Sequence, residues 1–240
     1  MADPTDTRIV VVTGASRGIG AACASAFLAL GDTVVGLSRS RGETPEGAEY
    51  LPCDLSEEGA VDAAIDEIVA RHGRIDVMIA NAGITRDQLA VRMTDADFDE
   101  VITTNLLGTF RCARGALKRM IRQRSGRIIM VSSIGAFMGL PGQANYAASK
   151  AGIVGMARAL AREVGSRSIT VNVIAPGLIA TEMTEVLGDD RLRAMEAQIP
   201  LGRIGRAEDV ADAAVFLASP GADYVTGAVL SVDGGLGMGH

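Results

Sequence analysis

The alternation of short apolar runs with longer helical stretches is the feature that most restricts the fold of this chain. The apolar runs are rich in β-branched residues and lack the polar alternation of a half-exposed strand, so both faces of each strand are expected to be buried. Such strands belong to parallel sheets that helices cover on both sides. The runs that we interpret as strands cover residues 8–14, 33–38, 49–55, 74–83, 126–133, 168–177 and 228–235.

The helical stretches between these runs carry recognisable end signals. Residues 57–73 follow Ser56, which we expect to be the N-cap of this helix, and Gly73 is expected to end it. Thr94 and Asp97 have the spacing of a capping box at the start of a later, long helix. Strands and helices therefore alternate along the chain, which is the pattern of a doubly wound fold.

The length and the composition of the chain favour one domain with an aliphatic core. The chain has 240 residues, of which 48% are hydrophobic, with 5 Phe, 3 Tyr and no Trp. Seven strands with their helices use up a chain of this length, so no separate substrate domain is expected. We predict a single α/β domain of the Rossmann type over residues 1–240, with a seven-stranded parallel sheet and helices on both faces. In this architecture, ligands bind in a crevice at the carboxyl ends of the strands.

Charge, hydropathy and the content of metal ligands argue against several classes of function. The formal net charge of −6 argues against nucleic-acid binding, and no uncharged apolar run is long enough to span a membrane. The polar N-terminal residues show no secretion signal, so we expect a cytoplasmic protein. The cysteines are scattered and are expected to be reduced, and the histidines are far apart in sequence, so we expect no metal site. These residues are Cys23, Cys53, Cys112, His72 and His240.

Three glycines separate the first strand from the helix that follows it. Gly14, Gly18 and Gly20 have the spacing G-x3-G-x-G within the sequence TGASRGIG. Glycines at this place let the backbone approach a pyrophosphate at the N-terminus of a helix, where free N–H groups and the helix dipole favour anions. Close packing of the strand against the helix is the alternative interpretation. The position directly after the first strand favours a dinucleotide.

The end of the second strand indicates which dinucleotide is bound. An NAD site needs an acidic residue there for the ribose 2′-hydroxyl, but the first acid after this strand is Glu43. Arg17 in the glycine loop and Arg39 after the strand could instead clamp a 2′-phosphate, which a guanidinium binds with two hydrogen bonds. Two solvated arginines are the alternative. The pattern favours NADPH and NADP⁺ as the cofactor.

Tyr146 and Lys150 form the most unusual pair in the chain. The sequence has three tyrosines and two lysines, so a spacing of four residues between one of each is not expected by chance. On a helix, residues i and i+4 share one face, and residues 145–165 carry an apolar stripe with the helical period. A nearby ammonium stabilises a phenolate and lowers the pKa of the phenol, which could then act as a general acid in the reduction of a carbonyl. The alternative is an incidental pair on the surface of a helix.

Two further polar positions lie where the crevice is expected. A serine hydroxyl after the strand over residues 126–133 could donate a hydrogen bond to a substrate oxygen as charge builds up on it. On local grounds, Ser132 and Ser133 are equal candidates. Asn105 lies in an otherwise apolar helix, where its side-chain amide needs a hydrogen-bond partner. A structural role and a functional role for Asn105 are equally supported.

Together these residues resemble the short-chain dehydrogenase/reductase family. The matching motifs are TGASRGIG at 13–20, NAG at 81–83, Asn105, Ser133, Tyr146 with Lys150, and APG at 175–177. The resemblance covers nearly the whole chain from Arg8 onward. Ser133 stands 13 residues before Tyr146, as in the family, which selects it over Ser132. Within the family, the stretches 142–152 and 161–177 resemble bacterial reductases that act on 3-oxoacyl chains bound to an acyl-carrier protein, and the last residues resemble the actinobacterial form.

The resemblance implies an activity and a set of roles. The activity is the NADPH-dependent reduction of a carrier-bound 3-oxoacyl chain to the 3-hydroxyacyl form in fatty-acid synthesis. Tyr146 would protonate the 3-oxo group, and Ser133 would hold its oxygen. Lys150 would lower the pKa of the tyrosine and bind the nicotinamide ribose, and Asn105 would position a water that relays protons to Lys150. The implied cofactor contacts are Gly14, Ser16, Arg17, Gly18, Ile19, Gly20, Arg39, Asp54, Leu55, Asn81, Ala82, Gly83, Tyr146, Lys150, Pro176, Gly177, Ile179 and Thr181.

The resemblance also implies a lid, a docking surface and an assembly. Residues 182–200, with Met183, Leu187, Met195 and Ile199, resemble the family's mobile lid over the substrate, although an ordinary amphipathic surface helix has the same pattern. Arg127 and Arg167 match arginines that dock the acidic carrier protein, and solvated arginines at helix ends are the alternative. The implied assembly is a homotetramer.

Two other functions compete with this interpretation. One is a related reductase that acts on acetoacetyl-CoA, a polyketide intermediate or another small ketone. The other belongs to a different class, a cofactor-binding protein without catalysis. Because Asn105, Ser133, Tyr146 and Lys150 fill all four catalytic positions of the family, the enzyme is favoured.

Overall fold

Seven strands form one sheet in which all neighbouring strands run parallel. The computed structural model describes residues 7–185 and 188–238. The strand order is β3-β2-β1-β4-β5-β6-β7, and the predicted α/β fold of the Rossmann type is confirmed. The strands are β1 (Ile9–Thr13), β2 (Thr33–Ser38), β3 (Glu49–Pro52), β4 (Val77–Ala80), β5 (Gly126–Val131), β6 (Ile169–Pro176) and β7 (Val229–Val232).

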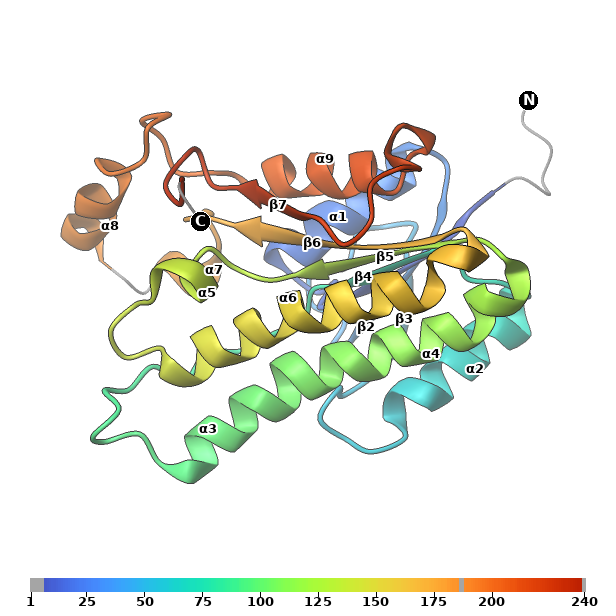
Figure 1. Cartoon of the computed structure of the whole chain (residues 1–240), viewed down its shortest axis with the longest axis horizontal. Coiled ribbons are helices and arrows are strands. Elements are labelled where there is room, and N and C mark those ends of the chain that lie inside the picture. Colours follow the sequence, from blue (N-terminus) through green and yellow to red (C-terminus); the bar gives the residue numbers. More distant parts are fainter. Residues whose placement is uncertain (1–6, 186–187, 239–240) are drawn as a thin grey trace.

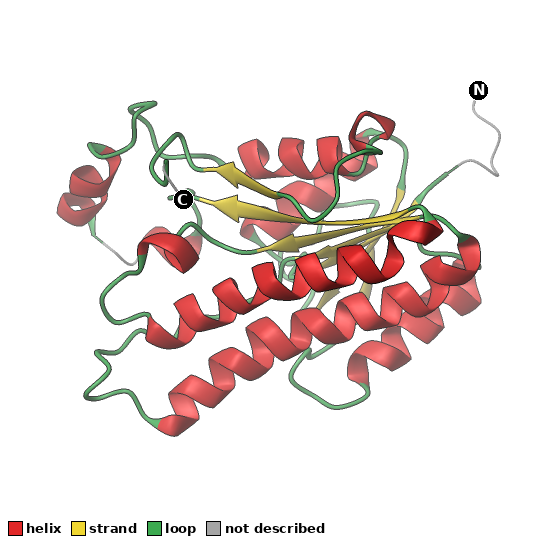
Figure 2. Ribbon diagram, viewed as in Figure 1, coloured by secondary structure: helices red, strands yellow, loops and turns green. Residues whose placement is uncertain are grey.

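Helices cover both faces of the sheet. Figure 1 shows α2, α4 and α6 along one face and α1 and α9 along the other, and Figure 2 shows loops and short helices gathered beyond the strand arrowheads. Within the described residues, no helix is both long and apolar enough to cross a membrane. The elements are α1 (Gly18–Ala29), α2 (Ala60–His72), α3 (Asp95–Val101), η2 (Ile102–Leu107), α4 (Gly108–Gln123), α5 (Gly135–Met138), α6 (Ala144–Val164), η3 (Gly165–Arg167), α7 (Glu182–Glu185), α8 (Asp189–Glu196), α9 (Ala207–Leu217) and η4 (Pro220–Ala222).

The two faces of the sheet pack into two apolar clusters. Ile9 and Val11 of β1 belong to the cluster under α2, α4 and α6, whereas Val10 and Val12 belong to the cluster under α1 and α9. Every residue of β1 is therefore buried. This double burial explains why the strand sequences are continuously apolar instead of alternating.

The order of the strands reverses direction beside β1. The chain proceeds from β1 to β2 and β3 on one side, and then crosses to β4 and continues to β7 on the other side. Connections that leave β1 and β4 therefore diverge at their carboxyl ends, where doubly wound sheets form their ligand crevice. The glycine loop follows β1 at this point, and residues 81–83 follow β4.

One predicted helix end is confirmed, and one predicted helix start is wrong. Gly73 ends α2 with a φ of 77°, as expected for a glycine cap. Ser56, however, is not the N-cap, because α2 begins at Ala60 after Gly59. The backbone N–H and the hydroxyl of Ser56 both donate to Asp54 Oδ1, at 2.9 and 2.6 Å. These bonds form a separate turn ahead of the helix.

The long helix after Thr94 is irregular. The predicted capping box is confirmed, since Thr94 Oγ1 accepts from the N–H of Asp97 at 3.1 Å and Asp97 Oδ2 accepts from the N–H of Thr94 at 3.2 Å. Between α3 and α4, the segment η2 is a π-helix, which the sequence pattern did not predict. Such segments are frequent at functional sites, and η2 carries Asn105.

Candidate active site

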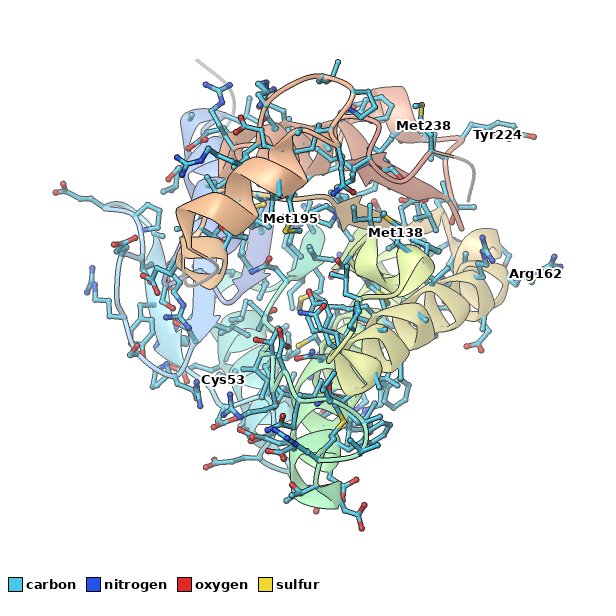
Figure 3. All side chains as sticks on the ribbon, turned by 90° about the vertical axis from the view of Figure 1, so that its left-hand side faces the viewer. Cys53, Met138, Arg162, Met195, Tyr224 and Met238 are labelled. Atoms are coloured by element: carbon cyan, nitrogen blue, oxygen red, sulfur yellow. The ribbon has the colours of Figure 1, made fainter. Side chains whose placement is uncertain are left out.

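Four of the predicted catalytic residues meet at the carboxyl edge of the sheet. Ser133 follows β5, Tyr146 and Lys150 lie in the first two turns of α6, and Asn105 lies in η2. Figure 3 looks onto this edge, with the labelled side chains of Met138 from α5 and Met195 from α8 in front of it. The sequence spacing thus brings together residues from three separate elements.

Lys150 is buried and points back toward the sheet. Its residue is 3% exposed, and its Nζ donates a hydrogen bond of 2.8 Å to the carbonyl oxygen of Val131. Burial disfavours the ammonium and lowers the pKa of Lys150 to about 8. Nζ lies 5.7 Å from the centre of the Tyr146 ring, so the amine and the ring share one pocket.

The pKa of Tyr146 differs from the sequence-based expectation. We expected the ammonium of Lys150 to lower it, but burial of the phenol raises the pKa to about 12. A hydrogen bond with Ser133 acts in the opposite direction, and the carboxylate of Asp87 adds to the increase. The physical reason is that desolvation of a phenolate outweighs the single hydrogen bond. The phenol therefore keeps its proton at neutral pH and is available as a proton donor.

The structure separates the roles of the two serines after β5. Ser132 is buried, and its hydroxyl donates to the carbonyl oxygen of Lys150 at 2.8 Å, which attaches α6 to the sheet. Ser133 interacts with Tyr146 through its hydroxyl, and its Oγ also accepts from the N–H of Gly135 at 3.0 Å. Ser133 is thus the serine placed beside the phenol, as the spacing in the sequence predicted.

Asn105 has structural partners for its whole side-chain amide. Its Oδ1 accepts from the N–H of Ile84 at 2.8 Å, and its Nδ2 donates to the carbonyl oxygen of Ile84 at 2.9 Å and to Ser149 Oγ at 3.2 Å. A Cβ placed on Gly83 would lie 3.2 Å from Asn105 Oδ1 and 3.4 Å from Lys150 Nζ. The side chain therefore sets the path of the chain after β4 next to the lysine. Its predicted role in a proton relay stays a prediction.

The loops after β1 and β4 are tied together. Thr13 Oγ1 accepts from the N–H groups of Asn81 and Ala82, both at 3.0 Å, and Asn81 Nδ2 donates to the carbonyl oxygen of Thr13 at 3.0 Å. A Cβ on Gly20 would lie 2.0 Å from the carbonyl oxygen of Gly14, so only glycine fits there. The predicted contacts Gly14, Ser16, Arg17, Gly18, Ile19, Gly20, Asn81, Ala82 and Gly83 come together at this place.

The N-terminus of α1 has the features of an anion site. No side chain caps it, and its first turn contains no acidic residue. Its N–H groups therefore lack the side-chain acceptors that usually satisfy them, and the helix dipole favours a negative charge at this end. The residues present thus fit the pyrophosphate of a dinucleotide.

A groove lies between the end of β2, the end of β3 and the start of α2. It has a volume of about 460 Å³ and is lined by Arg39, Cys53, Asp54 and Glu57, among other residues. Cys53, labelled in Figure 3, marks its place. Leu55 is buried behind this wall. The groove therefore brings two of the predicted cofactor residues, Arg39 and Asp54, to one surface.

The predicted contacts after β6 approach the glycine loop from the other side. A Cβ on Gly18 would lie 3.3 Å from the methyl group of Thr181, and Arg17 Nη1 donates to Glu182 Oε2 at 2.7 Å. Ile179 is buried and bridges to Gly205. Pro176 ends β6, and Gly177 packs against Asp233 so closely that a Cβ would lie 2.7 Å away.

The predicted lid contains two short helices. α7 begins directly after Thr181, and α8 lies beyond the carboxyl ends of the strands, at the left of Figure 1. Met195 is partly buried and Ile199 is buried. Leu187, which we expected in the lid, lies outside the described residues. The movement of the segment stays a prediction.

The structure does not bring Arg127 and Arg167 to the catalytic residues. Arg127 is the second residue of β5 and Arg167 precedes β6, so both lie at the amino ends of the strands. Ser133 lies six residues further along from Arg127, about 20 Å at the rise of a strand. Arg127 also pairs with Asp223 and donates to the carbonyl oxygen of Gly126.

Ser149 is a residue of the site that the sequence analysis did not identify. It is fully buried on α6, accepts from Asn105 Nδ2, and donates to the carbonyl oxygen of Tyr146 at 2.7 Å. Ser149 therefore links η2 to the turn of α6 that carries the tyrosine. The signal was a polar residue on the apolar side of a predicted helix, which needs a partner.

A glycine loop at the strand reversal and a partly buried serine and tyrosine beside a buried lysine together define a dinucleotide-dependent oxidoreductase. The chain belongs to the short-chain dehydrogenase/reductase family, whose members depend on a nicotinamide cofactor. Residues 14–237 match a family model described as Enoyl-(Acyl carrier protein) reductase. This match and the relatives below confirm the resemblance seen in the sequence.

The chain is similar over nearly its full length to bacterial 3-oxoacyl-[acyl-carrier-protein] reductases. It is 44% identical to FabG of Salmonella typhimurium over 238 residues, which cover 96% of this chain and 98% of that protein. It is 45% identical to MabA of Mycobacterium avium, with 98% of this chain and 91% of that protein covered. MabA of Mycobacterium bovis is 44% identical, with 99% and 96% covered.

Proposed function

We propose that this protein catalyses the NADPH-dependent reduction of 3-oxoacyl chains on an acyl-carrier protein to 3-hydroxyacyl chains in fatty-acid synthesis. The observation that carries the proposal is the position of Tyr146, which is hydrogen-bonded to Ser133 and lies next to the buried Lys150. The 3-oxoacyl-[acyl-carrier-protein] reductases FabG and MabA support the substrate, because they align with almost the whole chain.

Reduction of a ketone needs a hydride and a proton. The nicotinamide cofactor, when bound, supplies the hydride. Tyr146 donates the phenol proton to the ketone oxygen, and the raised pKa of about 12 keeps that proton in place until charge develops on the oxygen. The hydroxyl of Ser133, which already interacts with the phenol, donates a hydrogen bond to the same oxygen and stabilises the developing charge.

Lys150 and Asn105 assist the proton donor Tyr146 without contacting the substrate themselves. Among the described residues, Lys150 Nζ donates to the carbonyl oxygen of Val131, and an ammonium has three donors, so two remain for the ribose of the cofactor. A ligand that supplies acceptors favours the charged form and raises the pKa of Lys150 above about 8. The charged amine then stabilises the phenolate that remains after proton transfer. Asn105 keeps η2 and residue 84 in register with the lysine.

The preference for NADPH over NADH rests on the end of β2. The strand ends at Ser38 and is followed by the exposed Arg39, without an acid that would bind a free 2′-hydroxyl or repel a phosphate. Arg17 of the glycine loop pairs with Glu182, and it would have to leave this partner to reach the same phosphate. A 2′-phosphate placed there would meet two guanidinium groups.

The proposed assembly is a homotetramer, and the proposed location is the cytoplasm. Leu107 and Phe110 of the long helix are 39% and 36% exposed, and a Cβ on Gly155 of α6 would meet nothing within 4 Å. Exposed apolar and small residues on neighbouring helices favour packing against a second copy. The three cysteines are free and buried, in keeping with a reducing compartment.

Docking of an acidic carrier protein at Arg127 and Arg167 remains our proposal, with one condition. Because these arginines lie at the opposite edge of the sheet from Tyr146, a carrier bound there delivers its chain to the active site of a neighbouring copy in the tetramer. The pairing of Arg127 with Asp223 favours the alternative function, reduction of a coenzyme A thioester or another small ketone.

Initial rates with paired substrates test the proposal. We expect NADPH to be strongly preferred over NADH, and a 3-oxoacyl-carrier protein to have a higher kcat/KM than the matching coenzyme A thioester. In a variant with Arg127→Ala and Arg167→Ala, only the carrier substrate should lose efficiency. A matching 2-enoyl thioester is the control, since the family model is described by that reaction. Equal use of the coenzyme A thioester would favour the alternative function, and turnover of the enoyl thioester alone would contradict the proposal.

A further inference from the structure

One arginine of α4 holds the loop between β3 and α2. The guanidinium of Arg111 donates through Nη1 to three successive carbonyl oxygens, those of Leu55 at 2.7 Å, Ser56 at 2.9 Å and Glu57 at 3.4 Å. These carbonyls belong to neither strand nor helix, because β3 ends at Pro52 and α2 begins at Ala60. A charged donor therefore binds carbonyl groups that belong to no regular secondary structure.

The same loop is fixed from its other side by Asp54. The carboxylate accepts both the N–H and the hydroxyl of Ser56, and these hydrogen bonds lower the pKa of Asp54. α4 also touches the loop directly, since a Cβ on Gly108 would lie 2.9 Å from the Cβ of Leu55. The loop is thus held between a carboxylate within it and a guanidinium on the helix behind it.

The loop forms one wall of the groove between the ends of β2 and β3 and the start of α2. Asp54 and Glu57 line this groove from the loop, and Arg39 lines it from the end of β2. Arg111 is partly buried and is absent from the lining. It therefore contacts the outer side of the wall, and any effect that it has on a ligand in the groove must act through residues 54–57.

We propose that Arg111 is a positioning residue for the adenine half of the cofactor, because it holds residues 54–57 in the shape of the groove wall. The inference rests on the proposed use of a nicotinamide dinucleotide. Without the guanidinium, the three carbonyl oxygens accept hydrogen bonds from water instead, and the loop adopts further conformations. The nucleotide then has to order the loop when it binds, and this cost weakens binding. Tyr146 and Lys150 share no hydrogen bond with this loop among the described residues, so the rate at saturating cofactor is unaffected.

The test measures the adenine half of the cofactor directly. Adenosine 2′,5′-bisphosphate is titrated into the full-length protein by calorimetry, with wild type, Arg111→Gln and Arg111→Lys. We expect the glutamine variant to bind roughly five- to thirtyfold more weakly, from the loss of a charge-assisted hydrogen bond. The lysine variant should be intermediate, since it keeps the charge but not the planar fork. It also serves as the second variant if the glutamine variant does not fold.

Two controls separate positioning from general stability. Arg114→Gln, one turn further along α4, removes a guanidinium that pairs with Asp62 and lies over the Phe110 ring, and should leave nucleotide binding unchanged. Reduced nicotinamide mononucleotide, which lacks the adenine half, should give the same kcat/KM with wild type and Arg111→Gln. With NADPH, the variant should show a raised KM and an unchanged kcat.

The outcomes distinguish this inference from the proposed function. Unchanged binding of the bisphosphate by Arg111→Gln overturns the inference, even if the melting temperature falls, because the arginine would then act on stability alone. Equal losses with NADPH and with the mononucleotide also overturn it. If 3-oxoacyl substrates are not reduced but the bisphosphate binds with the expected dependence on Arg111, the proposed substrate fails and the inference stands.

Discussion

At the amino ends of the strands, charged side chains neutralise one another, whereas at the carboxyl ends Lys150 and the N-terminus of α1 keep hydrogen-bonding capacity for a ligand. Arg8, just before β1, binds Asp32 through two hydrogen bonds of 2.9 and 2.6 Å. Asp76, just before β4, accepts from Arg74 and from the N–H of Ile9. At the carboxyl ends, Lys150 Nζ donates to a neutral acceptor, the carbonyl oxygen of Val131, and the first turn of α1 contains no acidic residue.

The difference shows that the two ends of the strands have different roles. Ion pairs at the amino edge satisfy their own charges, so they stabilise the fold and leave little attraction for an anion. The donors without a charged partner at the carboxyl ends lower the stability of the protein alone. A ligand that supplies acceptors stabilises the folded protein when it binds. This contrast predicts that substitutions of Tyr146 and Lys150 at the carboxyl ends change kcat, whereas substitutions of buried ion pairs at the amino ends change stability.

Tyr146→Phe should produce the largest effect. Removal of the proton donor should lower kcat by roughly 10²- to 10⁴-fold, the range of general acid catalysis. The melting temperature should stay close to that of wild type, because the ring still fills its pocket. Single-turnover rates and thermal unfolding of the same preparation check both statements. Retention of more than a tenth of the activity would contradict the role of the phenol.

The pH dependence of the reaction should follow Lys150 and not Tyr146. Burial lowers the pKa of Lys150 to about 8, so its positive charge is present below this pH and is lost above it. Tyr146 stays protonated up to about pH 12. We expect kcat/KM for NADPH, which reports on the free enzyme, to fall by up to about tenfold per pH unit above about pH 8. A profile that is flat from pH 7 to 10 would show that the charge of Lys150 is not needed.

The free energy of unfolding should also depend on pH through Lys150 and Tyr146. Between about pH 8 and 10.5, the unfolded chain keeps the proton of Lys150 and the folded chain does not, so this residue makes the free energy of unfolding rise with pH. Between about pH 10 and 12, the folded chain keeps the proton of Tyr146 that the unfolded chain loses, so the tyrosine makes the free energy fall. Denaturant unfolding of Lys150→Met should lack the first of these two contributions.

Asp32→Asn should show the smallest effect on catalysis and a clear effect on stability. Asp32 is buried and holds Arg8, so loss of its charge should lower the free energy of unfolding by roughly 1–3 kcal/mol. The kcat and KM values at 25 °C should not change. Asp223→Asn is the matched control at the same edge, because its side chain is 63% exposed and an exposed pair contributes roughly 0–1 kcal/mol. A change in kcat for either variant would break the contrast between the two ends of the strands.

The sequence predicted the elements of this molecule better than it predicted their electrostatics. Continuous apolar strands sufficed for the parallel sheet, and rare residues at a helical spacing sufficed for Tyr146 and Lys150, because both signals are local. The prediction that the pKa of Tyr146 is lowered was wrong in direction, because the shift depends on how far the folded chain excludes water from the phenol. Burial of this kind arises from tertiary packing, which no single stretch of sequence contains.

The same limit applies to the helix starts and to the distant arginines. Ser56 looked like an N-cap, but Asp54 competes for its hydrogen bonds two residues earlier. Arg127 and Arg167 could be matched to a family motif, but their distance from Tyr146 follows from the direction of β5 and β6 in the sheet. Ser149 was overlooked because its partner Asn105 is 44 residues away in the sequence.

The helix of α3, η2 and α4 limits how the length of this protein can change in evolution. It carries Asn105 next to Lys150 and Arg111 behind the groove wall, on one continuous rod. An insertion or deletion of one residue between them would turn Arg111 by about 100° relative to Asn105, so both contacts could not survive it. Homologous chains should therefore vary in length in the surface loops, such as the one before Thr94, and keep a constant spacing of six residues between these two positions.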